Sequence, residues 1–240
     1  MTMTKVHPWL AEVRRGIEER ADPERAAQMR AYMKSSMPYA GVGMPEAKRL
    51  FKEVFARYPE GTPSRRPFDD EARFFADVRA IWDGARVREE RYAALELLTC
   101  ARAKKVRTPN VVPLLRHVVV TGAWWDLVDW AAPKTLGPLL VTHPREAAKV
   151  VRAWAREDDI WLRRSAVLAQ LHAKARTDTK LLEDALAPSL GDREFFLAKA
   201  IGWALREYAK TDEAWVRRYL EAHRERMAKL SVREDETHLA

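Results

Sequence analysis

Trp161-Leu-Arg-Arg-Ser-Ala-Val-Leu-Ala-Gln-Leu171 is one of two related segments that reveal a repeat in this chain. Its order of an aromatic residue, small and branched residues, and a leucine returns 34 positions later in Phe195-Phe-Leu-Ala-Lys-Ala-Ile-Gly-Trp-Ala-Leu205. Ala94-Leu95, in an earlier segment, matches Ala166-Val167 at about twice that step. This order is expected of the inner helix of a stacked helix pair, and a period of this size indicates a helical-repeat array.

Helical spacing extends through the rest of the chain, because apolar residues recur at steps of three and four rather than in alternation. Asp22 predicts a cap for a helix that begins at Pro23, and prolines 109 and 144 mark later starts. We therefore expect about a dozen helices in an all-α, HEAT-like helical-repeat solenoid with one concave face. The alternative is an irregular helical bundle. In Pro45–Tyr58 the apolar stripe consists of Ala47, Leu50, Phe51, Val54, Phe55 and Tyr58.

The domain organisation follows from this periodicity. We expect a single repeat domain over residues 1–240, since repeat arrays often run long as one unit. Its predicted parts are N-terminal helices over about 8–58, an exposed basic loop at 59–67, repeat helices over about 68–228, and a polar tail at 230–240.

The composition limits the class of protein. The 240 residues include 43 Lys and Arg against 35 Asp and Glu, so the formal net charge is +8 and a polyanion is a plausible partner. A single cysteine excludes a disulfide framework and a Cys-rich zinc site, and the six histidines include no i,i+4 pair, so we expect no metal site. The sequence has neither a bilayer-spanning apolar run nor a signal peptide, which predicts a soluble intracellular protein.

An unusual density of aromatic and acidic residues occurs in Thr121-Gly-Ala-Trp-Trp-Asp-Leu-Val-Asp-Trp130. Gly122 can end one helix and let the next begin. Trp125 and Asp129 stand four apart, so on a helix their side chains share a face. An aromatic ring beside a carboxylate suits a cationic group or a transition state that becomes cationic. The plain alternative is a core tryptophan beside a solvated or capping aspartate.

A second cluster is basic. Trp203, Arg206 and Lys210 fall on one helical face at steps of three and four. Arg164 adds a planar guanidinium fork suited to phosphate. Each basic residue alone is explained by a solvated face or a surface ion pair, whereas a row of them on consecutive inner helices would form a phosphate track.

Three blocks together resemble the AlkD-type DNA alkylation repair glycosylases in order and spacing. They are Trp124-Trp125-Asp126-x-Val128-Asp129, then Ile160-Trp161-Leu162-x-Arg164, and Phe195-Phe196-x-x-Lys199-Ala-Ile-Gly-Trp203-x-Leu-Arg-Glu-Tyr-Ala-Lys210-Thr211. Weaker similarity occurs in Tyr32-Met33-Lys34 and in Gly41-Val42-x-x-Pro45-Glu46. The similarity covers most of the chain, and the third block is the most specific.

The resemblance implies a HEAT-like solenoid whose basic face grips duplex DNA. It implies excision of cationic N3- and N7-alkylated purines, which leaves an abasic site, with the lesion stacked in the duplex rather than flipped out. Asp129 matches the family's catalytic carboxylate, and Trp125 and Trp203 match its aromatic pair beside the lesion's deoxyribose. Arg164 matches an arginine on the DNA backbone, and Tyr32 matches a tyrosine that lines the same cleft. To the DNA-binding surface we also assign Arg206, Lys210, Lys34 and Lys48.

The implied enzyme needs no metal or organic cofactor and acts on double-stranded DNA as a monomer, in the cytoplasm and at the nucleoid when bound. Two other hypotheses for the function remain. A non-catalytic relative would bind damaged or branched DNA without excision, and a protein-interaction scaffold would expose an apolar groove and lack salt-dependent DNA binding. The sequence leaves the lesion range open, from small methyl adducts to bulky adducts and crosslinks.

Overall fold

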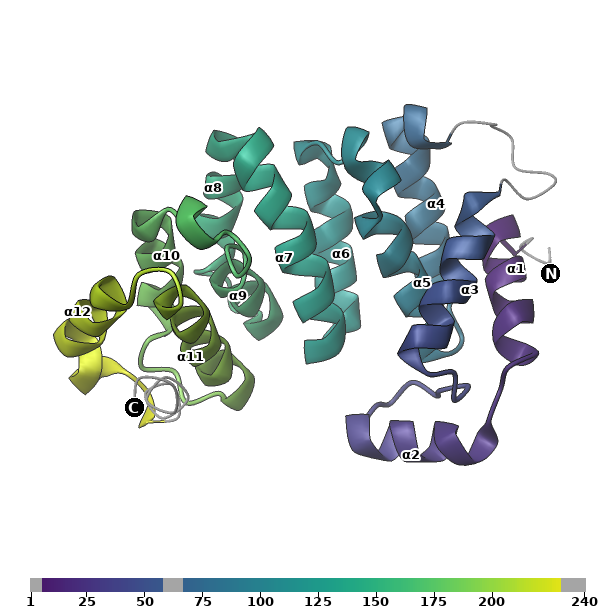
Figure 1. Cartoon of the computed structure of the whole chain (residues 1–240), viewed down its shortest axis with the longest axis horizontal. Helices are drawn as coiled ribbons and strands as arrows, with labels where there is room; N and C mark the ends of the chain where they lie inside the picture. The colour runs from purple at the N-terminus through teal and green to yellow at the C-terminus, as the bar shows by residue number, and fades with distance from the viewer. Residues whose placement is uncertain (1–5, 58–66, 230–240) are drawn as a thin grey trace. The chain divides into compact units, whose positions relative to one another are not determined.

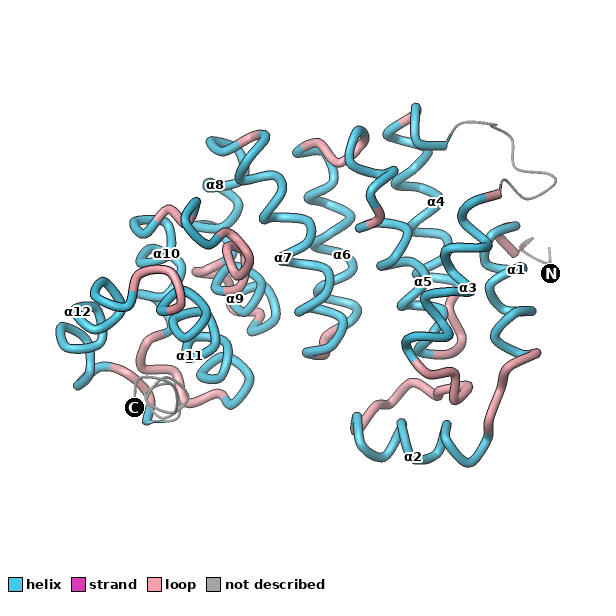
Figure 2. The backbone as a smooth tube through the Cα atoms, in the orientation of Figure 1, coloured by secondary structure: helices cyan, strands magenta, loops and turns pink. Residues whose placement is uncertain are grey.

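The computed structural model describes residues 6–57 and 67–229, and within these ranges the regular structure is helical, without strands (Figures 1 and 2). This confirms the predicted all-α class. The described residues form twelve α-helices joined by turns and short 3₁₀ helices. The first five are α1 (Pro8–Glu18), α2 (Pro23–Met33), α3 (Met44–Ala56), α4 (Glu71–Gly84) and α5 (Arg88–Thr99). The other seven are α6 (Val112–Gly122), α7 (Trp125–Thr142), α8 (Pro144–Trp154), α9 (Ile160–Val167), α10 (Thr179–Leu186), α11 (Phe195–Ala209) and α12 (Glu213–His223).

The chain divides into two compact units, Met1–Arg107 and Thr108–Ala240. A repeat array makes contacts only between neighbouring repeats, so a division of this kind is compatible with one solenoid. The single domain and its concave basic face stay predictions. The expected basic loop at 59–67 lies outside the described residues apart from Pro67, which begins a 3₁₀ helix, and the polar tail at 230–240 lies outside them as well.

In the first unit, α4 packs along α5, and α1 packs against α3 and α5. Large side chains that are fully buried form its core, among them Trp9, Phe51 and Trp82. The predicted helix at Pro45–Tyr58 is α3, which begins one residue earlier and ends two residues earlier. Five residues of the predicted apolar stripe are buried in it: Ala47, Leu50, Phe51, Val54 and Phe55.

Helix α2 differs from its neighbours because none of its residues is buried. Figure 1 shows it apart from the other helices of the first unit, across the ends of α1 and α3. It begins as predicted, with the Asp22 carboxylate accepting a hydrogen bond from the Arg25 amide at 3.0 Å. It ends at Met33, and the following C-cap residue Lys34 takes a left-handed backbone conformation with φ 48°.

Buried polar contacts of the following loop anchor α2 to the unit. The Glu89 side chain on α5 has no exposed surface and accepts hydrogen bonds from the amides of Ala40, Gly41 and Val42 at 2.9–3.1 Å. Burial of a carboxylate without hydrogen-bond partners costs free energy, and three amide donors from consecutive residues supply those partners here. The Asp22 amide in turn donates to the Ala40 carbonyl at 2.9 Å. The start of α2 is therefore tied to α5 through this loop.

In the second unit, α7 packs against α6, α8 and α9, and α9 packs against α11. The predicted repeat holds at two places, since Ala166 and Ala200 are buried alike, as are Leu171 and Leu205. It fails at the aromatic position, where Trp161 is 7% exposed and Phe195 is 53% exposed. The repeat therefore describes two buried positions but not the first turn of α11, and Leu171 lies beyond the end of α9.

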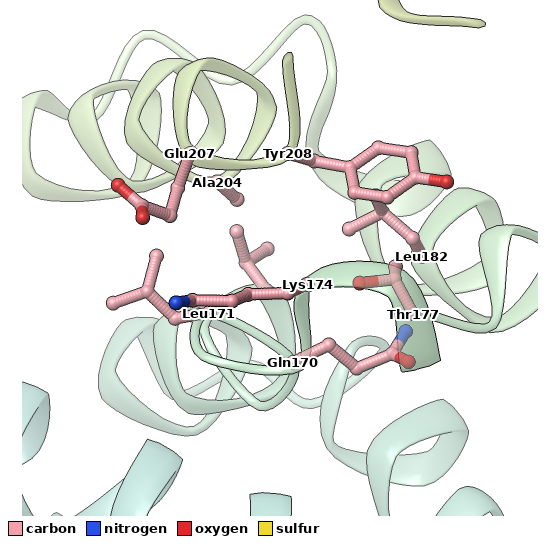
Figure 3. Close-up of a pocket in the computed structure, with 9 residues that line it drawn as sticks. Gln170, Leu171, Lys174, Thr177, Leu182, Ala204, Glu207 and Tyr208 are labelled. Carbon is pink, nitrogen blue, oxygen red and sulfur yellow. The ribbon is translucent and has the colours of Figure 1, made fainter. Parts of the chain in front are cut away.

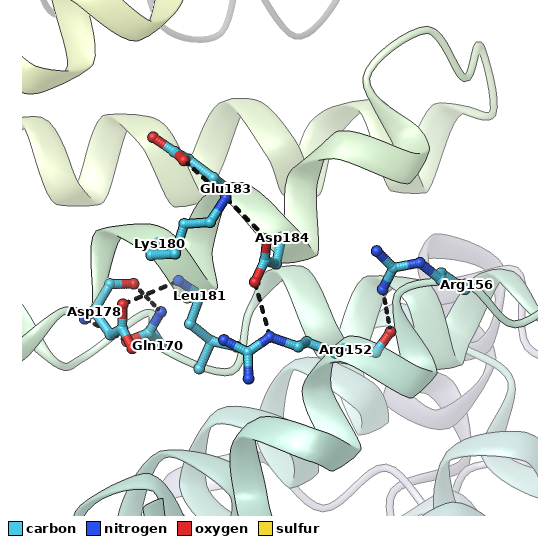
Figure 4. A network of polar contacts seen from close by, with 8 residues as sticks. All are labelled: Arg152, Arg156, Gln170, Asp178, Lys180, Leu181, Glu183 and Asp184. Atoms are coloured by element: carbon cyan, nitrogen blue, oxygen red, sulfur yellow. Dashed lines mark hydrogen bonds and ion pairs between the residues drawn. The ribbon is translucent and has the colours of Figure 1, made fainter. Parts of the chain in front are cut away.

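A polar network joins α8 and α10 on the surface of this unit (Figure 4). The Asp184 carboxylate accepts a hydrogen bond from the Arg152 Nε at 2.8 Å and lies 3.3 Å from the Lys180 Nζ. Beside them, Gln170 and Asp178 exchange two hydrogen bonds across the turn before α10. The hydrogen bond from Arg152 and the nearby Lys180 hold the pKa of Asp184 below its ordinary value.

We expect Asp184→Asn to lower the free energy of unfolding at neutral pH by at most about 1 kcal/mol, because water and salt screen a surface pair. Since the pKa of Asp184 is lowered on folding, its contribution is present above the unfolded pKa and is lost as the pH falls through the folded one. Urea titrations between pH 7 and pH 3 should show that the free energies of unfolding of the wild type and of Asp184→Asn become equal in acid. A difference between them that stays constant across this pH range would contradict a stabilising role for the ionised Asp184.

Candidate active site

The junction of α6 and α7 positions the predicted acidic and aromatic residues. Helix α6 ends at Gly122 as predicted, but the left-handed residue that reverses the chain is Ala123, with φ 40°. Trp124 is the N-cap residue of α7, and Trp125 is the first helical residue. Trp125 and Asp129 therefore lie one turn apart at the start of α7, and both are partly exposed.

The structure brings Asp129 and Arg164 together, although 35 residues separate them. The Arg164 Nε and Nη2 donate to the two Asp129 carboxylate oxygens, each at 2.7 Å. The Nη1 of the same guanidinium donates to the Phe196 carbonyl in the first turn of α11. Arg164 thus links α9, α7 and α11.

The carboxylate of Asp129 is held in a poorly solvated place, with 14% of its side chain exposed. Burial raises the pKa of Asp129, and the neighbouring Asp126 also raises it, whereas the hydrogen bonds and charge of Arg164 lower it; burial has the largest effect. A negative charge in such a place interacts more strongly with a nearby positive charge than it would in water. The site therefore suits a reacting group that becomes cationic.

An aromatic cluster lies beside the ion pair and was not predicted as a unit. The rings of Trp124, Trp161 and Phe196 contact one another with centroid separations of 5.2–6.0 Å. The Trp124 Nε1 is buried without a hydrogen-bond partner among the described residues. The three members of this cluster come from three separate blocks of sequence, and their contacts form only when α7, α9 and α11 pack.

The other predicted residues of the second unit lie on α11 or at its end. Trp203 is partly buried and packs against the apolar core that α9, α10, α11 and α12 share. Arg206 is partly exposed on the same helix. Lys210 follows the last helical residue, is exposed, and forms an ion pair with Glu207 at 2.6 Å.

Three predicted residues belong to the first unit. Tyr32 lies in the last turn of α2 with 81% of its surface exposed, a large fraction for an aromatic residue. Lys34 ends α2 and Lys48 lies on α3, and both are exposed. Their assignment to DNA binding stays a prediction.

A small cavity occurs elsewhere in the second unit, between α9, α10 and α11 (Figure 3). Its wall includes Leu171, Lys174, Leu182 and Tyr208. The volume of about 10 Å³ suits about one water molecule, so it is too small for a substrate. Within residues 6–57 and 67–229, no group of three or more His, Cys, Asp and Glu is placed to hold a metal ion, and no helix is long and apolar enough to span a membrane.

Comparisons with known proteins identify relatives of this chain. A model of the DNA alkylation repair enzyme family matches residues 13–239. A solved structure described as a predicted DNA alkylation repair enzyme from Enterococcus faecalis is 29% identical, with a TM-score of 0.79 over 92% of this chain and 97% of the other. No curated protein sequence matches.

Proposed function

The chain belongs to the family of DNA alkylation repair enzymes, and from that premise we propose that it is a monofunctional DNA glycosylase. Its substrates are N3- and N7-alkylated purines in duplex DNA, and its product is an abasic site in an uncut strand. The observation that carries the proposal is the Asp129 carboxylate, which is largely buried and oriented by two hydrogen bonds beside Trp125 at the start of α7.

The chemistry of these lesions suits this site. An alkylated purine carries a positive charge and leaves readily, so no general acid has to protonate it. As the bond from C1′ to the base nitrogen lengthens, the sugar becomes an oxocarbenium ion. The Asp129 carboxylate would stabilise that charge and orient the attacking water. Trp125 and Trp203 would add cation–π contacts of about 0.5–2 kcal/mol.

DNA binding is assigned to basic and aromatic residues of both units. Arg206 and Lys210 supply positive charge at α11, and Lys34 and Lys48 supply it in the first unit. The highly exposed Tyr32 presents a ring that is available to a ligand. With the lesion left stacked in the duplex, the enzyme needs no pocket for a flipped base.

Base release tests the proposal directly. Purified protein is incubated with duplexes that each contain one N7-methylguanine or one N3-alkyladenine, and free base is measured against an unmodified duplex and a no-enzyme blank. We expect release of the alkylated bases with the DNA strand left uncut. If the protein binds damaged duplexes or four-way junctions but releases no base, it is a non-catalytic DNA-binding relative instead.

A further inference from the structure

Helix α7 carries two prolines in its interior, Pro133 and Pro138, and the first of them follows Asp129 by four residues. A proline has no backbone N–H, so the Asp129 carbonyl cannot receive the hydrogen bond that residue 133 would donate in a regular α-helix. The proline ring also crowds that same carbonyl. Pro133 therefore interrupts the backbone hydrogen bonds of α7 directly after the turn that carries Trp125 and Asp129.

A second irregularity lies two residues further along α7. Thr135 has no exposed surface, and its Oγ1 has no hydrogen-bond partner among the described residues. In three other helical threonines the same hydroxyl donates to the carbonyl four residues earlier, at 2.6–3.2 Å: Thr99, Thr121 and Thr142. The stretch from Asp129 to Thr135 therefore lacks two hydrogen bonds that other helical segments of this protein form.

Separate contacts hold the two halves of α7. Before Pro133, the Asp129 carboxylate accepts two hydrogen bonds from Arg164 on α9. After Pro133, the backbone at Gly137 approaches the chain that follows α9, so closely that an added Cβ would lie 3.2 Å from the Ala169 carbonyl oxygen. In an unbroken helix the direction of one half would fix the direction of the other. The interruption at Pro133 lets each half take the direction that its own contact sets.

We propose that Pro133 is a positioning residue for base excision. Its missing N–H releases the first turns of α7 from the rest of the helix, so that Trp125 and Asp129 take the orientation that the reaction needs. The inference rests on the proposed function and gives a role to a residue that does not touch the substrate. Proline is the least favourable residue in a helix interior, so its presence at a buried position in mid-helix needs a compensating gain. The placement of the carboxylate supplies that gain.

The experiment compares the wild type with Pro133→Ala, which restores the N–H donor, and with the matched control Pro138→Ala. Pro138 lies in the same helix but is exposed and more than two turns beyond Asp129. Single-turnover release of N7-methylguanine is measured at saturating enzyme, together with the affinity for undamaged duplex. For Pro133→Ala we expect an unchanged affinity and a rate about 10–100-fold lower, because a small misplacement of a reacting group has a cost of this order. Pro138→Ala should match the wild type in both.

A purely structural role for Pro133 predicts a different result. Partial unfolding would lower the amount of active enzyme but not the rate constant at saturating enzyme. A wild-type rate constant for Pro133→Ala, whatever its thermal stability, would therefore overturn the inference. A rate loss that is undiminished when Asp129→Asn is already present would overturn it as well, because a residue that acts through Asp129 should have little additional effect there.

A backbone ester separates the missing N–H from the proline ring, and it serves even if Pro133→Ala fails to fold. L-Lactic acid in place of Pro133 supplies the side chain of alanine without an N–H, so the Asp129 carbonyl stays without its helical donor. We expect this variant to release base near the wild-type rate. A loss of about 10-fold or more would show that the packing of the ring matters instead, and would overturn the inference. A wild type that releases no base defeats the proposed function, a result obtained before any variant is compared.

Discussion

Asp129→Asn is expected to slow the release of N7-methylguanine by on the order of 10²–10³-fold, the usual loss when one group that stabilises transition-state charge is removed. Asparagine keeps the size of the side chain and one oxygen that can accept from Arg164, but it has no charge for the developing oxocarbenium ion. Affinity for undamaged duplex should stay the same, since the carboxylate contributes nothing to holding phosphates. Single-turnover excision and equilibrium binding, measured on the same preparation, test both expectations.

Asp126→Asn is the matched control, because Asp126 lies in the first turn of the same helix, one turn before Asp129. Its loss of charge should change the excision rate little and should lower the pKa of Asp129, which Asp126 raises. Thermal unfolding of both variants checks that α7 still packs. Excision at the wild-type rate by Asp129→Asn would remove Asp129 from the mechanism.

Gly41→Ala is expected to destabilise the first unit by about 3 kcal/mol or more, through strain and a backbone collision. Gly41 has φ 90°, which residues with a side chain rarely adopt. A Cβ at this position would lie 2.1 Å from the Asp22 carbonyl oxygen and 2.9 Å from the Ala26 amide nitrogen. Both atoms belong to the backbone that starts α2, so neither can move aside without disturbing the helix.

Gly43→Ala is the control for this change, two residues along the same loop. Gly43 has φ −64°, and the nearest atom to its added Cβ is the flexible Nη2 end of Arg25, which can rotate away. Its cost should be about 1 kcal/mol, because alanine is a poorer N-cap residue than glycine. Urea unfolding of both variants gives the comparison. Equal stabilities would show that the loop can adopt another conformation at Gly41.

The helical class and many helix starts could be predicted because their signals are local. Asp22 caps the helix that begins at Pro23, and Pro144 opens α8, each within one turn of the residue that carries the signal. The residue that reverses the chain before α7 was less predictable. Gly122 is the residue with the conformational freedom, yet Ala123 takes the left-handed conformation.

The sequence indicates candidate site residues, but their arrangement could not be predicted from it. Helical spacing correctly placed Trp125 and Asp129 on one short segment of α7. Spacing describes the face of a helix and not what packs against it, so the pairing of Asp129 with Arg164 could not be derived from it. The exposure of Phe195 was missed for the same reason, since the burial of the first turn of α11 depends on its neighbours.

The detachment of α2 from the core has a consequence for how this protein can change over generations. Because none of its eleven residues is buried, substitutions at the exposed positions of α2 leave the core of the first unit intact. What must be kept is the attachment, the buried Glu89 and the left-handed Gly41. The exposed side chains of α2, including Tyr32, can therefore change by mutation with little effect on folding. Selection on them acts mainly through the ligand that α2 contacts.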